Sequence, residues 1–277
     1  MPIEISIIIV SYNVQYFIEQ CLNSIYETSN FKGSKQVIVV DNNSSDGSIN
    51  VIKEKFKEVV LIKNDENVGF SVANNQGIKI ANGRFILLLN PDTLLSEDTL
   101  STCIQEMISN PKTGALGVRM VDGSGNFLPE SKRGFPSPKA SFFRFSGIFK
   151  VFPRSAKFNS YYQGHVDEFE KAEIEILCGA FMFIRRTVLD EIGLLDESFF
   201  MYGEDIDLSY KIEKSGYKNQ YFGNVKTLHY KGESTTKDAI YLERFYGAMK
   251  IFYSKHFSSN FLFNGIVSLG VKLASRS

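Results

Sequence analysis

The N-terminal third of the chain alternates between two hydrophobic periods, and this alternation restricts the fold more than any other feature. Continuous runs of β-branched and apolar residues, typical of strands covered on both faces, occur in 5–12, 36–48, 59–64 and 84–90. Helical spacing of apolar residues occurs in 14–29, 48–56 and 69–83, with Gly83 placed to end the third helix. This β-α-β-α-β-α-β order implies parallel strands joined by right-handed crossovers. We therefore expect an α/β fold with a Rossmann-like, mostly parallel central sheet and flanking helices.

Polar residues end three of these predicted strands. Ser11, Tyr12 and Asn13 follow the first strand, Asp41 follows the second, and Asn90-Pro91-Asp92 follows the fourth. Ligands of such sheets bind beyond the carboxyl ends of the strands. An Asp after a strand is also common in turns, so either acid alone is explained as readily by structure as by function. Two acids in register, with Asn13 beside them, favour a polar site.

Composition and short motifs exclude several classes of protein. The 277 residues are 43% hydrophobic and 22% charged, with 31 Lys+Arg against 31 Asp+Glu, so we expect a folded soluble protein without a field that favours nucleic acid. The three cysteines have neither metal-ligand nor disulfide-framework spacing, which fits a reducing cytosol. The N-terminus lacks signal-peptide features, and no apolar run reaches the roughly 18 residues of a spanning helix. No Gly-rich phosphate motif is present, so a classical dinucleotide or P-loop site is not expected.

The second half of the chain contains a cluster of acids at a predicted helix start. We expect a hairpin in 117–134, a strand through 174–186, a short helix at 187–191, a helix within 199–217 and a strand with a loop in 219–235. The helix dipole favours acids in a first turn by about 0.3–1 kcal/mol each, which explains one or two of Glu204, Asp205 and Asp207. The aromatic lead-in "DESFFMYG" is better suited to lining a cleft, where apolar walls can tune a carboxylate as a general base. His229, taken alone, is more often structural than functional.

A basic and aromatic stretch without any acid extends over 132–164. Its cations are Lys132, Arg133, Lys139, Arg144, Lys150, Arg154 and Lys157, interleaved with Phe and Tyr. Nucleic-acid binding is disfavoured by the neutral composition of the whole chain, and an ordinary amphipathic lid is a second interpretation. We favour a third, a surface that lies against an anionic membrane or a lipid-phosphate acceptor.

Five segments, taken together, resemble the family 2 glycosyltransferases of GT-A fold. They include "VIVVDNNSSDGS", "NVGFSVANNQGIKIANGRFILLLNPDT" and "HYKGEST", and they occupy 6–25, 37–48, 67–93, 178–217 and 229–235. The chain is most similar to the rhamnosyltransferase-like branch, whose members often build bacterial surface polysaccharides. The resemblance implies a GT-A domain over 1–236, with a nucleotide-sugar-binding half (1–115) and an acceptor and catalytic half (116–236). A helical, aromatic extension that can associate with a membrane would follow over 237–277.

The resemblance also implies roles for single residues. Ser11, Asn13 and Asp41, with Tyr12 among them, match positions that hold the base and ribose of the donor, and Asn67, Gly69 and Asn74 match a loop and helix start that approach it. Asp92 matches the last acid of the D-x-D motif, which holds Mg²⁺ or Mn²⁺ on the diphosphate, while Asn90 replaces the first acid. His229 matches a late histidine that can reach the metal or the diphosphate. Asp205 matches the catalytic base of the E-D motif, with Glu204 beside it.

The implied reaction is inverting transfer of a sugar from dTDP-rhamnose or a UDP-hexose to a saccharide or lipid-linked saccharide. We expect it in the cytoplasm, with peripheral contact to the inner face of the cell membrane. A catalytically silent sugar-nucleotide-binding scaffold on the same fold is the first alternative. A nucleotidyltransferase is the second, but it normally needs a Gly-rich, Arg- or Lys-bearing loop after the first strand, which "SYNVQYF" does not supply.

Overall fold

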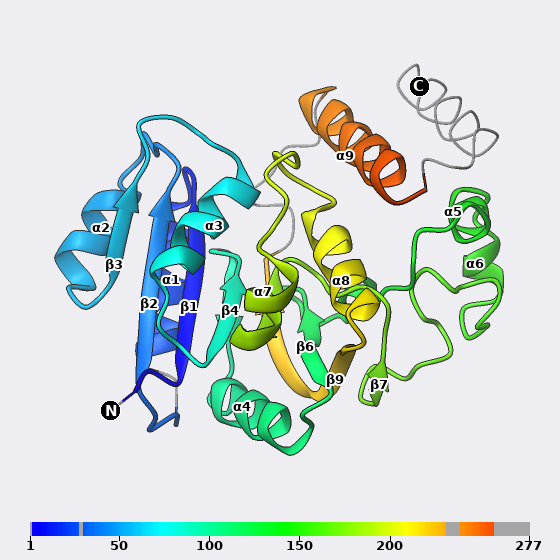
Figure 1. The fold of residues 1–277 in the computed structure, drawn as a ribbon, viewed down its shortest axis with the longest axis horizontal. Helices are drawn as coiled ribbons and strands as arrows, with labels where there is room; N and C mark the ends of the chain where they lie inside the picture. Colours follow the sequence, from blue (N-terminus) through cyan, green and yellow to red (C-terminus); the bar gives the residue numbers. More distant parts are fainter. Residues whose placement is uncertain (1, 28–29, 231–238, 258–277) are drawn as a thin grey trace.

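A nine-stranded sheet runs through the part of the chain that the computed structural model describes, residues 2–27, 30–230 and 239–257 (Figure 1). Its strands are β1 (Ile5–Ser11), β2 (Lys35–Asp41), β3 (Val60–Lys63), β4 (Phe85–Leu89), β5 (Thr93–Leu95), β6 (Thr113–Val121), β7 (Lys171–Glu173), β8 (Phe181–Arg185) and β9 (Lys218–His229). The order is β3-β2-β1-β4-β8-β6-β9-β5, and β7 pairs with β9.

The predicted parallel half of the sheet is confirmed. β1 pairs in parallel with both β2 and β4, and β3 pairs in parallel with β2. Beyond β4 the sheet is mixed, because β8 runs antiparallel to β4 and β6, while β6 and β9 are parallel. In the parallel half, Ser11 lies opposite Asp41 in register, so the ends of β1 and β2 meet at one edge.

Helices cover both faces of the sheet, which explains why the strands read as continuous apolar runs. One core contains Ile5, Ile7 and Ile9 and packs against α1 (Gln15–Tyr26), α2 (Ser48–Lys55) and α4 (Thr99–Ser109). The other contains Ile8 and Val10 and packs against α3 (Phe70–Ile80), α7 (Arg186–Ile192) and α8 (Glu204–Lys214). Successive strand residues therefore alternate between two buried faces.

Three expectations about single elements differ from the structure, the first wholly and the other two in extent. Gly83 does not end α3, which stops at Ile80. An added Cβ at Gly83 would lie 2.3 Å from the backbone nitrogen of Ser6, so the glycine allows a close approach to β1. Only the second part of the predicted strand 174–186 is a strand, β8, while 174–180 form a loop with one bridge from Ile176 to Arg133. The predicted hairpin 117–134 is present in a shorter form. An antiparallel bridge joins Val121 to Phe127, the Leu128 N–H donates to the Met120 carbonyl, and the short helix η1 (Pro129–Ser131) follows.

Three further helices lie outside these two layers. α5 (Pro138–Phe145) and α6 (Ile148–Val151) lie at the opposite end of the molecule from α2 (Figure 1). α9 (Ala239–Phe257) packs on α8 through a small third core that includes Phe199, Ala248, Phe252 and Tyr253. Of the predicted extension 237–277, residues 237–238 and 258–277 lie outside the described residues. Among the residues that are described, no helix is both long and apolar enough to cross a membrane.

Candidate functional site

Ser11 and Asp41 form the first part of the site, at the ends of β1 and β2. Both side chains are fully buried. Asp41 Oδ2 accepts a hydrogen bond from the Ser44 backbone N–H at 2.9 Å. Its Oδ1, and the Ser11 hydroxyl, have no hydrogen-bond partner among the described residues. Buried polar atoms normally find a partner, so this edge of the sheet is suited to a polar ligand.

Asn13 connects the end of β1 to the loop that follows β2. Its backbone is left-handed, with φ of 53°, a conformation that Asn tolerates better than most residues. The Asn13 side-chain oxygen accepts from the Ser45 backbone N–H at 2.7 Å, and its own N–H donates to the Ser44 hydroxyl at 3.0 Å. Tyr12, beside it, remains 48% exposed. The loop after β2 is thereby held beside Ser11 and Asp41.

Asn67 and Gly69 lie in the loop that precedes α3. The Asn67 side-chain oxygen accepts from the Gly69 N–H at 3.1 Å and from the Asn42 amide at 3.3 Å. Gly69 has φ of 87°, and an added Cβ would lie 2.7 Å from the carbonyl oxygen of Phe200, so only glycine fits. Asn74 differs, because its amide donates to the Phe70 carbonyl at 2.9 Å within α3. The Asn74 amide is therefore hydrogen-bonded within its own helix and not to the loop.

Asp92 and His229 meet where β5 pairs with β9. His229 Nε2 lies 3.3 Å from Asp92 Oδ1, and both side chains are at least nine-tenths buried. The Asp92 backbone is fixed as well, since its carbonyl accepts from the Tyr230 N–H at 2.9 Å. His229 Nδ1 is buried without a hydrogen-bond partner among the described residues. Asn90, two residues earlier, is half-buried.

Asp92 and His229 can supply part of the coordination shell of a divalent cation, with the remaining contacts coming from a bound substrate. Among the described residues, no group of three or more His, Cys, Asp or Glu side chains could hold a metal by itself. Mg²⁺ is commonly held by one or two carboxylates together with substrate phosphates. Asp92 and His229 can supply two of the contacts, and a diphosphate would supply others.

Asp205 lies in the first turn of α8 and is held by three donors. Its Oδ2 accepts from the Gly179 N–H at 3.1 Å and from the guanidinium of Arg133, and its Oδ1 accepts from the Ile206 N–H at 2.8 Å. Arg133 also donates to the Leu177 carbonyl. Burial opposes the charge of Arg133, but the neighbouring Asp205 carboxylate raises the Arg133 pKa well above its ordinary value. The carboxylate and the guanidinium therefore form a fixed ion pair.

The loop between β7 and β8 joins Asp205 to the end of β4. Gly179 donates its N–H to Asp205, and the next residue, Ala180, accepts the N–H of Asn90 at 3.0 Å. Two adjacent residues thus link the acid of α8 to the Asn90-Pro91-Asp92 turn. Because 174–180 form a loop and not a strand, the Gly179 N–H and the Ala180 carbonyl are available for these contacts.

Glu204 has a different environment from that of its neighbour. It is 7% exposed, and its Oε2 has no hydrogen-bond partner among the described residues. Burial, and then the charge of Asp205, raise the pKa of Glu204 to about 8. Glu204 is therefore predominantly a neutral carboxylic acid at pH 7, beside the ion-paired Asp205.

Glu204 and Asp205 line a cavity of about 120 Å³ between α5, α8 and α9. The remaining wall includes Arg144, Tyr161, Tyr202 and aromatic residues of α9.

The sequence reasoning missed Arg133 as the partner of Asp205 and missed the contribution of α9. Arg133 was grouped with a basic surface, and no local signal indicates a contact across 72 positions.

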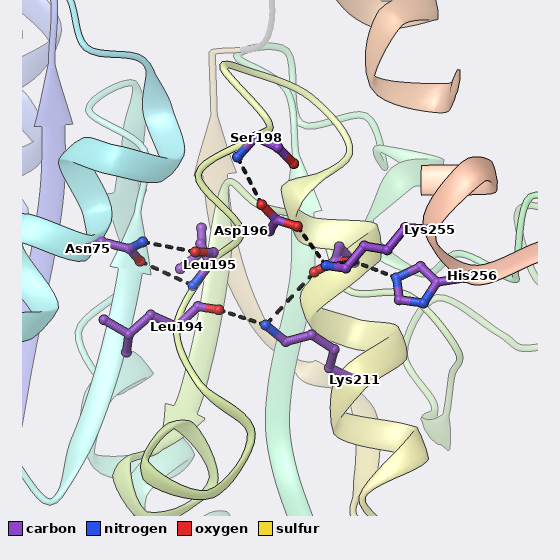
Figure 2. A network of polar contacts seen from close by, with 9 residues as sticks. Asn75, Leu194, Leu195, Asp196, Ser198, Lys211, Lys255 and His256 are labelled. Carbon is purple, nitrogen blue, oxygen red and sulfur yellow. Dashed lines mark hydrogen bonds and ion pairs between the residues drawn. The ribbon is translucent and has the colours of Figure 1, made fainter. Parts of the chain in front are cut away.

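A polar network holds α9 against α8 and the preceding loop (Figure 2). The fully buried Asp207 accepts from Lys255 at 2.9 Å and contacts His256 Nε2 at 2.6 Å.

The loop before α8 is part of the same network, because Lys255 also donates to Asp196 at 2.7 Å. Burial opposes the charge of Asp196, but hydrogen bonds from Lys255 and Ser198 lower its pKa to about 2. The loop itself is tied to α3, since the Asn75 amide donates to the Leu195 carbonyl at 2.8 Å.

The fold and this arrangement place the chain among the glycosyltransferases of GT-A fold. Residues 6–193 match the model of Glycosyl transferase family 2, and the chain belongs to this family. An N-acetylglucosaminyl-diphospho-decaprenol L-rhamnosyltransferase of Mycobacterium tuberculosis is 26% identical over 213 residues, covering 73% of this chain and 68% of the relative. A low-salt glycan biosynthesis hexosyltransferase of Haloferax volcanii is 26% identical over 217 residues, covering 76% and 62%.

Solved structures show the same fold at low identity. A mannosyltransferase from Pyrobaculum calidifontis, in complex with GDP-Man and Mn²⁺, has a TM-score of 0.64 at 19% identity and covers 99% of this chain and 73% of its own. TarS 1–349 of S. aureus, in complex with UDP-GlcNAc, has a TM-score of 0.59 at 20% identity, covering 90% and 65%. The chain spans only 39% of a longer TarS structure.

Proposed function

We propose that this protein is an inverting glycosyltransferase that moves a sugar from a nucleoside-diphosphate donor to a saccharide or lipid-linked saccharide in bacterial surface polysaccharide synthesis. Membership of family 2 supports glycosyl transfer. The observation that carries the proposal is the backbone link through Gly179 and Ala180. It connects Asp205 to the strand end that precedes Asp92, which supports a base and a diphosphate site at one edge of the sheet.

The donor would lie along the carboxyl ends of β1, β2 and β4. Ser11 and Asp41, with their buried unpartnered oxygens, would hold its base and ribose together with Asn13. Tyr12, Asn67, Gly69 and Asn90 would approach the donor, while Asn74 would keep the start of α3 in place. Asp92 and His229 would hold Mg²⁺ or Mn²⁺, which when bound stabilises the charge of the departing diphosphate.

Asp205 would act as the general base. It would take the proton from an acceptor hydroxyl, whose oxygen then attacks the anomeric carbon from the face opposite the leaving diphosphate. Arg133 and the Gly179 N–H would keep the carboxylate in one orientation during this step. The bond to the diphosphate breaks as the new glycosidic bond forms, so the product is inverted.

The names of the relatives suggest a chemical class for the sugar donor and for the acceptor. The mycobacterial relative carries a rhamnosyltransferase name with a diphospho-decaprenol acceptor, and TarS was solved with UDP-GlcNAc. We therefore propose dTDP-rhamnose or a UDP-hexose as donor and a lipid-linked saccharide as the favoured acceptor.

We also infer that α5 and α6 contact an anionic bilayer. Phe142, Val151 and Phe152 are 62%, 71% and 50% exposed. The exposed cations Lys139, Lys150, Arg154 and Lys157 have no ion pair with any described residue. The other cations of the stretch are used inside the protein, as Lys132 donates to two carbonyls and Arg144 stacks on Tyr161. Apolar side chains with unpaired cations suit the headgroup region of anionic lipid.

The test is an assay with dTDP- and UDP-sugars and a panel of octyl glycosides as acceptors. We expect release of nucleoside diphosphate coupled to a new glycoside whose anomeric configuration, read by NMR, is inverted. Asp205→Asn should lower transfer at least 100-fold with nucleotide binding preserved, and turnover above a tenth of wild type would exclude Asp205 as base. Nucleotide binding without transfer to any acceptor would favour the silent scaffold instead.

A further inference from the structure

A second and larger cavity is lined by the segment after β6 and by the loop between α6 and β7. Its volume is about 600 Å³, and ligand pockets typically measure roughly 300–1,000 Å³. Its lining combines the apolar side chains of Phe127, Pro129 and Tyr162 with polar groups that include Lys132 and Asn159. No residue that lines it belongs to the proposed donor, metal or base positions, so the cavity has no role in the function proposed above.

Two pairs of adjacent residues separate this second cavity from the cavity at the start of α8. Arg133 and Tyr161 line the cavity at α8, whereas their neighbours Lys132 and Tyr162 line the second cavity. The backbone at Lys132 is extended, with φ of −137° and ψ of 113°, and successive side chains of an extended chain point to opposite sides. The two cavities therefore lie on opposite sides of one wall.

Two polar side chains of the second cavity are more than nine-tenths buried and have unused hydrogen-bonding capacity. Lys132 donates to the carbonyls of Gln163 at 2.9 Å and Tyr162 at 3.2 Å, so its third N–H has no acceptor among the described residues. The Asn159 amide donates to the Pro153 carbonyl at 2.8 Å, but its Oδ1 has no hydrogen-bond partner in the described part of the chain. Buried polar groups normally find partners, so a ligand that offers both a donor and an acceptor suits this cavity.

The charges around the second cavity balance one another. The cations Lys132 and Arg154 are matched in the lining by the acids Asp167 and Glu168. Burial lowers the pKa of Lys132, and the charges of both acids oppose this effect. The cavity therefore has no excess of positive charge that would select a phosphate group.

A sugar hydroxyl meets the requirements of both unpaired groups. It can accept from Lys132 and donate to Asn159 Oδ1, whereas a phosphodiester has no hydrogen to donate and an ammonium group has no lone pair to accept. The rings of Phe127 and Tyr162 supply apolar surface that suits the C–H face of a pyranose ring.

We propose that the second cavity is a saccharide-binding site, separate from the catalytic site, that takes a short neutral oligosaccharide. Lys132 donates to one sugar hydroxyl, Asn159 Oδ1 accepts from one, and Phe127 and Tyr162 lie against the rings. Binding needs neither the donor nor transfer. For a transferase, a second point of attachment would raise the effective concentration of a saccharide chain at the catalytic site, and only this consequence rests on the proposed function.

The test is calorimetric titration of the full chain with maltotriose, cellotriose and chitotriose, in chelator and without nucleotide. We expect at least one trisaccharide to bind, and Lys132→Met and Asn159→Leu each to raise its Kd about tenfold or more. Asn50→Leu, the same exchange at an exposed position of α2, should leave the Kd unchanged. Asp205→Asn should also bind like wild type. Binding of none of the three sugars, or its loss in Asp205→Asn, would overturn the inference.

A measurement on the unchanged protein locates the site without relying on variants that alter the loop. The bound trisaccharide carries a diazirine, and after irradiation the labelled peptides are identified by mass spectrometry. We expect the label in 127–132 or 153–168. Label confined to other segments, or displacement of the sugar by pyrophosphate, would refute a neutral saccharide site here. Failure of the transfer assay with this binding intact would count against the proposed function alone.

Discussion

Glu204 and Asp205 are neighbours in the sequence, yet their carboxyl groups have different surroundings. Asp205 is paired with Arg133 and accepts two backbone N–H groups. Glu204 has no such donors and its pKa is raised to about 8 by burial and by the charge of Asp205. The Asp205 carboxylate is fixed in an ion pair, whereas burial and the charge of Asp205 keep Glu204 predominantly neutral at pH 7.

The raised pKa of Glu204 has a consequence for stability. The ordinary glutamate pKa is 4.5, so between pH 4.5 and about 8 the unfolded chain loses this proton while the folded protein keeps it. The contribution of Glu204 is complete below pH 4.5 and is lost as pH rises through the folded pKa. We expect Glu204→Gln to be increasingly more stable than wild type from pH 5 to 8, by up to about 1.4 kcal/mol per pH unit. Urea unfolding at four pH values measures this, and parallel stability curves would refute it.

The ends of the strands could be predicted from the sequence, whereas the contacts between distant segments could not. Continuous apolar runs predicted β1, β2 and β4 because both faces of these strands are covered. Parallel strands end at one edge, which also predicted the meeting of Ser11 with Asp41. The break before β8 had no comparable signal, because "ILCGAFMFI" (176–184) contains no polar or charged side chain. It follows from the antiparallel pairing of β8 with β4 and from the contact of Gly179 with Asp205.

The attachment of α9 to α8 depends on a buried carboxylate. Asp207 is fully buried and accepts from Lys255 and His256. Removing one partner of a buried charged network typically costs about 3–5 kcal/mol. We expect Asp207→Ala to lower the Tm by several degrees and to raise the acceptor KM, since α9 forms a wall of the cavity. The matched control is Asp190→Ala, whose exposed pair with Arg186 should contribute little. Equal Tm values for the two variants would contradict a structural role for the network.

The surface of α5 and α6 leads to a prediction about lipid vesicles. We expect the protein to float with vesicles of phosphatidylglycerol and phosphatidylcholine and not with phosphatidylcholine alone, with binding that weakens as salt rises. Phe142→Ser combined with Phe152→Ser should reduce the bound fraction. Tyr16→Ser is the control, because Tyr16 is 77% exposed on α1, away from this surface. Equal flotation of all three proteins would exclude α5 and α6 as the contact.

The molecule as a whole has two halves. The parallel half ends in the polar side chains of Ser11 and Asp41, and the mixed half carries Glu204 and Asp205 at the start of α8. We propose that the two halves, 1–115 and 116–236, divide the work between donor and acceptor. α9 (Ala239–Phe257) is packed on the second half through its own small core. Gly179 and Ala180 link the start of α8 to the end of β4, so a donor and an acceptor bound as we propose would be positioned by one sheet.

Nucleotide and metal binding test the donor half as a unit. A thermal-shift panel pairs UDP, dTDP, GDP and CMP with Mn²⁺, Mg²⁺ or chelator. A ligand at 100 times its Kd should add about 2.7 kcal/mol of stability, a shift of a few degrees for a chain of this size. We expect a metal-dependent shift with UDP or dTDP, because Asp92 and His229 supply only part of a cation shell and the diphosphate supplies the rest. Asp92→Ala should remove the metal dependence, whereas Asp98→Ala, on the solvent side of the following helix start, should keep it. A nucleotide shift that is identical with metal and with chelator would remove the cation from donor binding and leave Asp92 a structural role.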